Sequence, residues 1–324
     1  MTGNDGKTIL LSPVGGQAIS GIVKYFRNLD AKIVGIDKDS EAIGRHFVDK
    51  FISVPGVSDK AYPDTVLNII RSNKVDIFIS WLDPEIILWN KKFYASEIPG
   101  DLIDIFSINF RRDIIDFYDK FAFNFLLKSN KFNYPKTFLL DNETGVNIRP
   151  PVVIKPRIGY GTKNTHIAEN EDSLRYFRNL LLNKFGSAQK LIIQEFLEGS
   201  EFTIDFFSAN RKVVNAVARK RVKHKGVSLI GEVVHDNAMS KFLEHFCSTF
   251  NINGLNNIQV IKSREKYYVL DFNPRPSGTI IFSINAGVDL MNNLLEEKEG
   301  KKITEYGKPR NLKMVRYLCE YFYE

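Results

Sequence analysis

The chain contains few cysteines and no long hydrophobic stretch. Cys247 and Cys319 are the only cysteines among its 324 residues, too few for a disulfide framework or a cysteine-rich zinc site, so a reducing compartment is favoured. The most apolar stretch, residues 75–89, is interrupted by three acidic residues and a proline, and it falls short of the roughly 20 residues that a membrane helix needs. The first residues also lack the pattern of a signal peptide. We therefore expect a cytoplasmic protein without a membrane partner.

Several common catalytic signatures are missing as well. The five histidines show no metal-ligand spacing and indicate no Ser-His-Asp or Cys-His constellation; they are His46, His166, His224, His235 and His245. Gly15-Gly16 follows a predicted strand, but no Gly-Lys-Ser/Thr comes after it and the full G-x-G-x-x-G pattern is absent. We expect this pair to form a tight strand-to-helix turn that could still contact a ligand.

The net charge of +7 raises the question of nucleic-acid binding. The lysines are scattered, however, and no basic helix, zinc finger or RNA-binding strand motif is recognisable. The main basic concentration, residues 219–225, could be a solvated surface or could line a site for a polyanionic small molecule such as ATP. Both accounts of this segment stay open, but we expect no nucleic-acid partner.

Strands and helices alternate over the first hundred residues. Apolar segments predict strands at 7–14, 32–37, 50–54 and 75–81, with amphipathic helices at 16–29 and 61–72. Crossover helices between strands predict a parallel sheet covered on both faces, which is an open α/β domain. Ligands of such sheets bind beyond the carboxyl ends of the strands, where residues 12–16, Asp37 and residues 80–85 lie.

The pattern changes after residue 108. Residues 109–130 predict a long helix or a helix pair, and a linker with Pro135, Gly145 and Pro150-Pro151 follows. With helices at 172–184 and 237–251, the remaining strands are expected at 152–155, 165–168, 191–196, 202–209, 212–218 and 228–235. Strand pairs without crossover helices predict antiparallel sheets, so the second part of the chain should be an α+β fold.

A lysine and a short loop form the first candidate phosphate site. Lys155 ends an apolar strand, and the loop that follows contains Gly159 and Gly161. An ammonium group at a strand end can meet phosphate oxygens, and loop glycines let backbone N–H groups approach the same oxygens. The alternative is an ordinary hairpin with a solvated lysine.

A second candidate site lies at Gln194–Gly199, where a predicted strand ends in a short linker. The unpaired backbone groups at such an end can hydrogen-bond an adenine edge. Leu197 could cover the base, and the carboxylate of Glu201 could hold ribose hydroxyls. Taken alone, the segment could equally be a surface turn.

The third candidate site spans residues 259–278. Asp271 and Asn273 alternate on one strand and so face the same side, which Gln259 reaches if the two strands pair as a hairpin. Carboxylate and amide oxygens suit a hard cation such as Mg²⁺. Pro274 and Pro276 would hold Arg275 beside the ion. The alternative is a hairpin that ends in a proline-rich turn with a solvated arginine.

Together, these motifs resemble the ATP-grasp ligases, and most closely their carbamoyl-phosphate-synthase-like branch. Their order is Asp119-Lys120, Lys155, the glycine loop, Gln194–Gly199, Gln259 and Asp-Phe-Asn-Pro-Arg-Pro-Ser-Gly at 271–278. The resemblance implies a Rossmann-like pre-ATP-grasp domain over residues 1–108. It implies a small ATP-grasp lobe with linker helices over 109–200 and a large catalytic lobe over 201–324.

The resemblance also implies a role for each matching residue. The implied contacts to ATP phosphates are Lys120, Lys155, Gly159, Gly161 and Thr162. The implied adenine hinge and ribose acid are Glu195, Phe196, Leu197 and Glu201. The implied ligands of one or two Mg²⁺ ions, for which Mn²⁺ can substitute, are Gln259, Asp271 and Asn273. The implied catalytic residues are Arg275, Lys155 and Asn273.

The chain departs from the family pattern at two places. Asp271 stands where glutamate is usual, and its shorter side chain bridges two ions less easily. The glycine loop is shorter than in many relatives and carries Lys163-Asn164 where small residues are common.

The activity that the resemblance implies is ADP-forming ligation of a carboxylate to an amine, or to a thiol, through an acyl phosphate. The substrate site would lie between the N-terminal domain and the catalytic sheet. Its candidate residues are Arg219, Arg221, Glu232, Glu85, Ser277 and Gly278. Arg219 or Arg221 could bind the substrate carboxylate or could belong to a surface salt-bridge ladder, and Glu85 could bind the amine.

Two other functions stay open on the sequence alone. A small-molecule kinase would release the acyl or amide phosphate as its product, and a nucleotide sensor would bind ATP without chemistry. The aromatic segment 312–323 could pack on the core or form a dimer contact, so a monomer and a homodimer are both compatible with the sequence.

Overall fold

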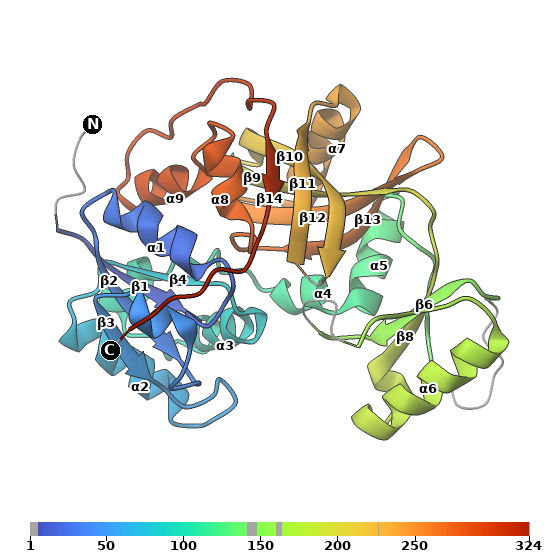
Figure 1. Cartoon of the computed structure of the whole chain (residues 1–324), viewed down its shortest axis with the longest axis horizontal. Helices are drawn as coiled ribbons and strands as arrows, with labels where there is room; N and C mark the ends of the chain where they lie inside the picture. The colour runs from blue at the N-terminus through green and yellow to red at the C-terminus, as the bar shows by residue number, and fades with distance from the viewer. Residues whose placement is uncertain (1–5, 141–147, 160–163, 226, 324) are drawn as a thin grey trace.

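The first hundred residues form a parallel sheet with helices on both faces, as predicted (Figure 1). The computed structural model describes residues 6–140, 148–159, 164–225 and 227–323. The strand order in the sheet is β3-β2-β1-β4. Its elements are β1 (Thr8–Ser12), α1 (Ile19–Arg27), β2 (Lys32–Asp37), β3 (Lys50–Ser53), α2 (Tyr62–Ser72), β4 (Ile77–Ser80) and α3 (Asp83–Tyr94), with 3-10 helices at Ile43–His46 and Gly100–Ile105.

Both faces of this sheet are buried, which leaves its edge for ligands. Ile9 and Leu11 join one core with α1, whereas Leu10 joins the core beneath α2 and α3. The Gly15-Gly16 turn contacts the end of β2, because the Gly15 N–H donates to Asp37 Oδ2 at 2.7 Å. A Cβ at position 15 would lie 2.9 Å from the same oxygen, so a larger residue there would have to displace the Asp37 carboxylate that accepts this hydrogen bond.

A pair of short helices leads out of the first domain. The pair consists of α4 (Ile114–Tyr118) and α5 (Lys120–Ser129). Asp119 separates the two helices and caps α5, since its carboxylate accepts from the backbone N–H of Phe121 and Ala122. The predicted stretch 109–130 is therefore a helix pair, and Lys120 is fixed as the first residue of the second helix.

A small antiparallel sheet follows, with the strand order β5-β8-β6-β7. Its elements are β5 (Thr137–Leu139), β6 (Val152–Pro156), β7 (His166–Ala168) and β8 (Leu191–Glu195), with α6 (Glu171–Phe185) and a 3-10 helix at Ala188–Lys190. Apolar residues of β6 and β8 pack beneath α6, including Val152, Ile154 and Ile193. Because side chains alternate along β6, Lys155 lies on the face opposite to that core.

The largest sheet has the strand order β13-β12-β9-β10-β11-β14, and all its neighbours are antiparallel. The elements are β9 (Ser200–Ala209), β10 (Lys212–Lys225), β11 (Val227–Val234), α7 (Asn237–Phe250), β12 (Gly254–Ser263), β13 (Lys266–Asn273), α8 (Ile280–Asn285), α9 (Leu290–Lys298) and β14 (Lys313–Val315). Phe206, Ile258 and Phe272 pack against α7 on one face. α8 and α9 pack with α1, so they join this sheet to the first domain.

The C-terminal segment crosses from the large sheet to the first domain (Figure 1). β14 pairs with β11, which makes it the edge strand of the sheet. Further on, the rings of Tyr321 and Tyr323 lie near His46, although both side chains stay exposed, as do Leu318 and Phe322. The segment thus packs on the chain in part, and the oligomeric state stays a prediction.

Within the described ranges, none of the helices combines the length and the apolar character needed to cross a bilayer. The predicted strand 212–218 was too short, because β10 continues to Lys225 through a run of charged residues that pairs with β11. The domain boundaries at 108 and 200 stay predictions.

Candidate active site

A cleft of about 450 Å³ lies between the small sheet and the large sheet. Most of the predicted site residues line it. Those residues are Lys120, Lys155, Glu195, Phe196, Leu197, Glu201, Arg221, Gln259, Asp271, Asn273, Arg275, Ser277 and Gly278. The roles predicted for them stay predictions, but the cleft brings these residues together from segments up to about 150 positions apart in the chain.

Strand register explains why the large sheet is polar on the cleft side. Gln259 lies directly opposite Asp271, and Asn257 lies opposite Asn273. On the other side of β12, Gln259 lies opposite Thr203 of β9. Directly opposed residues point to the same face of a sheet, so amide, hydroxyl and carboxylate groups from three strands face the cleft.

This polar face offers the oxygen donors that a magnesium ion prefers. Asn273 Nδ2 donates to Asn257 Oδ1 at 3.2 Å and to Asp271 Oδ2 at 3.3 Å. Burial raises the pKa of Asp271, although Lys120 nearby opposes the shift. Among the described residues, no group of three or more His, Cys, Asp or Glu side chains could hold a metal. One carboxylate with amide oxygens fits an ion that is shared with nucleotide phosphates.

Lys155 lies at the opposite wall of the cleft. Its ammonium group donates to Gln194 Oε1 at 2.8 Å, and the amide of Gln194 donates in turn to Thr137 Oγ1 at 2.8 Å. Burial and the nearby charge of Lys120 lower the pKa of Lys155 to about 8. A polyanionic ligand in the cleft would therefore favour the protonated form of Lys155.

We expect the affinity for MgATP to fall by about tenfold per pH unit above pH 8. Lys155 loses its proton in the empty cleft as the pH passes 8, whereas bound phosphates favour the protonated ammonium, so binding must take up a proton. Titration calorimetry with a non-hydrolysable ATP analogue from pH 7 to 9.5 measures this slope. The Lys155→Met variant should bind the analogue weakly, and its affinity should not depend on pH in this range. Lys91→Met, at an exposed position of α3, should show the same pH dependence as the wild type. A flat wild-type profile would contradict the assignment.

Lys120 contacts the start of the glycine loop. Its Nζ donates to the carbonyl oxygen of Gly159 at 2.6 Å, and the backbone N–H of Lys120 donates to Arg157 O at 3.1 Å. Arg157 also pairs with Asp119, which caps α5. These contacts tie the lysine to the loop. Gly161 and Thr162, predicted to close over the phosphates, lie outside the described residues.

The predicted adenine hinge joins the small sheet to the large one. Glu195 ends β8, and Phe196 and Leu197 line the cleft before β9 begins at Ser200. A Cβ at Gly199 would lie 2.2 Å from the carbonyl oxygen of Lys262, so the chain can pass this close to β12 only with glycine there. This close approach fixes where the two sheets meet.

Glu201, the predicted ribose acid, has a charged neighbour. Its carboxylate forms an ion pair with Arg221, whose Nη1 also donates to Gln259 Oε1 at 3.3 Å. Both side chains line the cleft. A ribose at Glu201 would therefore share the carboxylate with Arg221.

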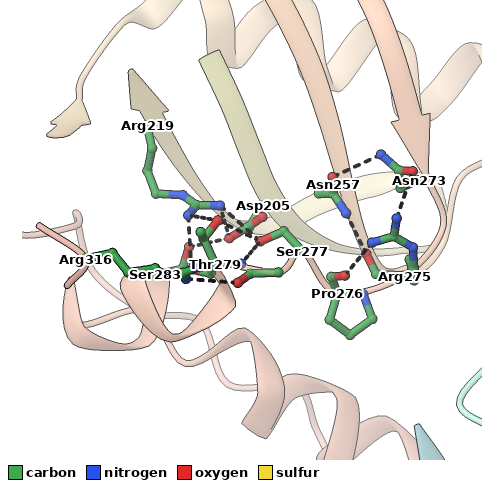
Figure 2. Close-up of polar contacts among 11 residues, drawn as sticks. Asp205, Arg219, Asn257, Asn273, Arg275, Pro276, Ser277, Thr279, Ser283 and Arg316 are labelled. Carbon is green, nitrogen blue, oxygen red and sulfur yellow. Dashed lines mark hydrogen bonds and ion pairs between the residues drawn. The ribbon is translucent and has the colours of Figure 1, made fainter. Parts of the chain in front are cut away.

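Arg275 donates to three acceptors, of which Figure 2 shows Asn273 and Pro276. Its Nε donates to Asp83 of the N-terminal domain, Nη2 donates to Asn273 Oδ1 at 3.3 Å and Nη1 donates to Pro276 O at 3.1 Å. Asn257 Nδ2 donates to the carbonyl oxygen of Arg275 at 2.9 Å, which fixes its backbone. Burial acts to lower the pKa of Arg275, but Asp83 outweighs it and raises the pKa.

Three residues near Arg275 were not named as site residues from the sequence. Asn257 could have been found, because it lies two positions before Gln259 and so shares its face. Asp83 lies in the segment 80–85 that was expected at the ligand edge of the parallel sheet, but its contact with Arg275 and the place of Tyr118 beside it arise from tertiary packing. The hydroxyl of Tyr118 is buried without a partner among the described residues, and burial and then Asp83 raise its pKa.

The prediction that Glu85 binds a substrate amine is wrong. Glu85 is fully buried beneath the first turn of α3, and the hydroxyl groups of Tyr62 and Ser80 donate to its carboxylate. Burial raises the pKa of Glu85, although these two hydrogen bonds oppose the shift. The first turn of α3 presents Asp83 to the cleft instead.

Two further substrate predictions fail for reasons of register and burial. Glu232 lies opposite Lys220 and pairs with Lys313, so it points away from the face that carries Arg219 and Arg221. Arg219 lies on the correct face but is buried, and it pairs with Asp205 rather than lining the cleft. A surface salt-bridge ladder is equally wrong for Arg219.

Two family models match the chain. Residues 187–320 match the model described as "ATP-grasp in the biosynthetic pathway with Ter operon". Residues 9–98 match the model described as "PylC-like, N-terminal domain". The two matches cover the large sheet with its hinge and the parallel sheet, respectively.

Curated relatives share about a quarter of their aligned residues with the chain. The carbamoyl phosphate synthase large chain of Clostridium beijerinckii is 24% identical over 309 residues, with 88% of this chain and 27% of the relative covered. The D-alanine–D-alanine ligase of Petrotoga mobilis is 24% identical over 252 residues, with 69% and 80% covered. The chain thus spans about a quarter of the length of the synthase large chains that it matches.

Solved structures confirm the predicted fold. N5-carboxyaminoimidazole synthetase from Staphylococcus aureus in complex with ADP has a TM-score of 0.74 and 14% identity, with 98% of this chain and 83% of that chain covered. Biotin carboxylase from Campylobacter jejuni in complex with β,γ-ATP has a TM-score of 0.68 and 14% identity, with 92% and 72% covered. At such low identity the likeness concerns the fold alone.

Proposed function

We propose that this chain, whose residues 187–320 match an ATP-grasp family model, is an ADP-forming ligase that activates a carboxylate with ATP and joins it to an amine. The observation that carries the proposal is one cleft in which Lys120, Lys155 and Arg275 face the oxygen donors of Asp271 and Asn273. Three cationic side chains beside a magnesium site suit the phosphates of a nucleotide. The relative named D-alanine–D-alanine ligase agrees with this class of reaction.

The proposed chemistry needs no covalent nucleophile. A carboxylate oxygen attacks the γ-phosphorus of ATP, the bond to the β-phosphate oxygen breaks, and an acyl phosphate and ADP form. The amine nitrogen then attacks the acyl carbon, phosphate leaves, and the nitrogen loses a proton. Lys120 and Lys155 would bind the phosphates, and Arg275 would offset the charge on the transferred group.

Magnesium would be held by Asp271 with the amide oxygens of Asn273 and Gln259, and when bound it would offset phosphate charge. The adenine would lie at Glu195–Leu197. The substrates are small molecules, a carboxylic acid and an amine or thiol. Ser277 and Gly278 line the cleft with Arg275 and are proposed to contact the acid.

A nucleotide sensor is the second candidate, because Asp271 is the one carboxylate of the proposed metal set. A single carboxylate with amides binds an ion less firmly than two carboxylates would, so ATP could bind without efficient transfer. A kinase that releases the acyl phosphate shares the first step with a ligase and differs only in its need for the amine.

ADP release with MgATP across a matrix of acids and amines tests the proposal. We expect turnover only with a particular acid–amine pair, and we expect Asp271→Asn to abolish it. Release with the acid alone would instead indicate a kinase. Tight ATP binding without ADP release in any well would contradict the proposal and favour the sensor.

A further inference from the structure

The C-terminal strand adds an arginine to the cleft face of the large sheet. Met314 of β14 lies opposite Gly231 of β11, which in turn lies opposite Arg221 of β10. Arg316 is two residues after Met314, so it points to the same face, and its backbone N–H donates to Leu229 O at 2.8 Å. The half-buried state of Met314 and Arg316, between exposed neighbours, agrees with this orientation.

Three arginines now share this end of the sheet, but only two have acidic partners. Arg219 pairs with Asp205, and Arg221 pairs with Glu201. No carboxylate of the described residues pairs with Arg316. Burial and the charge of Arg219 lower the pKa of Arg316, as expected for a cation that faces a like charge without compensation.

The same three guanidinium groups also have unused donors. Arg219 Nε, Arg221 Nε and Arg316 Nη1 are buried without an acceptor among the described residues. Buried donors without acceptors are rare in folded proteins, because each has lost its water. A bound anion beside Arg316 would supply an acceptor for its Nη1 and the missing negative charge.

Gly278 connects this cluster to the cleft. Arg316 Nη2 donates to the carbonyl oxygen of Gly278 at 3.2 Å, and both Gly278 and Arg221 line the cleft. A Cβ at position 278 would meet nothing within 4 Å, so the space beside this turn is open. Figure 2 shows Arg219 and Arg316 on one side of the turn that carries Ser277, with Arg275 and Asn273 on the other.

We propose that Arg316, beside Arg219 and Gly278, binds a second anionic group of the acid substrate, a carboxylate or a phosphate. This inference rests on the proposed ligase function and narrows its substrate class. One anionic group would lie near Arg275, where the transferred phosphoryl group is expected, and the other would lie at the arginine end of the cleft. An acid with a single negative charge would leave the positive charge of Arg316 without a negative partner.

Direct binding tests the site without any need for turnover. The protein is saturated with Mg²⁺ and a non-hydrolysable ATP analogue, so that inorganic phosphate cannot occupy the γ-phosphate position. Succinate, butyrate and inorganic phosphate are then titrated by calorimetry. We expect succinate or phosphate to bind and butyrate to bind more weakly. Preference for phosphate would identify a phosphorylated acid, and preference for succinate a dicarboxylate.

Variants assign the binding to Arg316. Arg316→Gln should weaken succinate or phosphate binding by about 10- to 100-fold, the usual range for a lost charge-assisted hydrogen bond. Arg316→Lys should restore part of the affinity. Arg310→Gln is the matched control, because Arg310 lies in the same segment and donates to a backbone carbonyl, Asn285 O at 2.6 Å, but it is exposed.

The outcomes separate the two proposals. Binding of neither anion, equal binding in Arg316→Gln, or an equal loss in Arg310→Gln would overturn the anion site. An intact melting temperature in both variants excludes misfolding as the cause. If the anion binds at Arg316 but no acid–amine pair releases ADP, the anion site stands and the ligase function fails. If a singly charged acid proves to be the best substrate, the ligase stands and the anion site fails.

Discussion

Replacing Arg275 with lysine should lower the rate of ADP release by about a thousand-fold while nucleotide affinity stays within a few-fold of wild type. Arg275 is positioned by Asp83, Asn273 and its own turn, so its planar guanidinium is fixed before a ligand arrives. Lysine keeps the positive charge that Asp83 needs but loses the two-pronged donor geometry. A fixed donor acts most strongly on charge that develops during transfer, which is why the rate should change more than the affinity.

Single-turnover ADP release and calorimetry with the non-hydrolysable analogue separate the two quantities. Arg310→Lys, at an exposed position, controls for general effects of the substitution. An equal loss of affinity and rate would show that Arg275 binds the ground state, and an unchanged rate would remove it from the catalytic set. Urea denaturation should show little change for Arg275→Lys, because the buried carboxylate of Asp83 keeps a cationic partner.

Much of this site could be predicted because it depends on alternation along single strands. Asp271 and Asn273 are two positions apart, and the hairpin to Gln259 fixes their common face. The same argument should have added Asn257. The parallel domain was equally accessible, since apolar strands and amphipathic helices repeat at regular spacing and leave few alternative arrangements.

Other parts depend on pairings that local sequence does not encode. Glu232 and Arg221 belong to neighbouring strands, but the β10–β11 register shifts near Lys223, so their faces could not be matched from spacing. Asp83 reaches Arg275 across about 190 residues, through the docking of one domain on another. Arg316 reaches Gly278, which lines the cleft, only because β14 pairs with the edge of the large sheet.

Arg219 shows how burial changes the role expected of a charged residue. Its Nη2 donates to Asp205, and its Nη1 donates to the carbonyl and hydroxyl oxygens of Thr279. Ser283 Oγ donates to the same carboxylate at 2.7 Å. The pair therefore joins β9 and β10 to the first turn of α8, next to Ser277 and the turn that carries Arg275. Burial lowers the pKa of Arg219, and Asp205 opposes that shift.

Arg219→Met should destabilise the protein by about 3–5 kcal/mol, because it leaves the carboxylate of Asp205 buried without a cation. The double variant Asp205→Leu with Arg219→Met removes both charges and should recover most of the loss, since an apolar pair of similar volume often replaces a buried ion pair at little cost. Urea denaturation of the wild type, the two single variants and the double variant measures this coupling.

The thermodynamic cycle also decides between structure and substrate binding. If Arg219 is structural, the double variant regains stability and its KM for the acid changes little, since the remaining cleft residues are intact. If Arg219 instead binds the substrate, Arg219→Met would be nearly as stable as wild type, and its KM for the acid would rise in the single and double variants alike. The buried carboxylate of Asp205 favours the first result, because a cation already committed to one carboxylate has little charge left for a second.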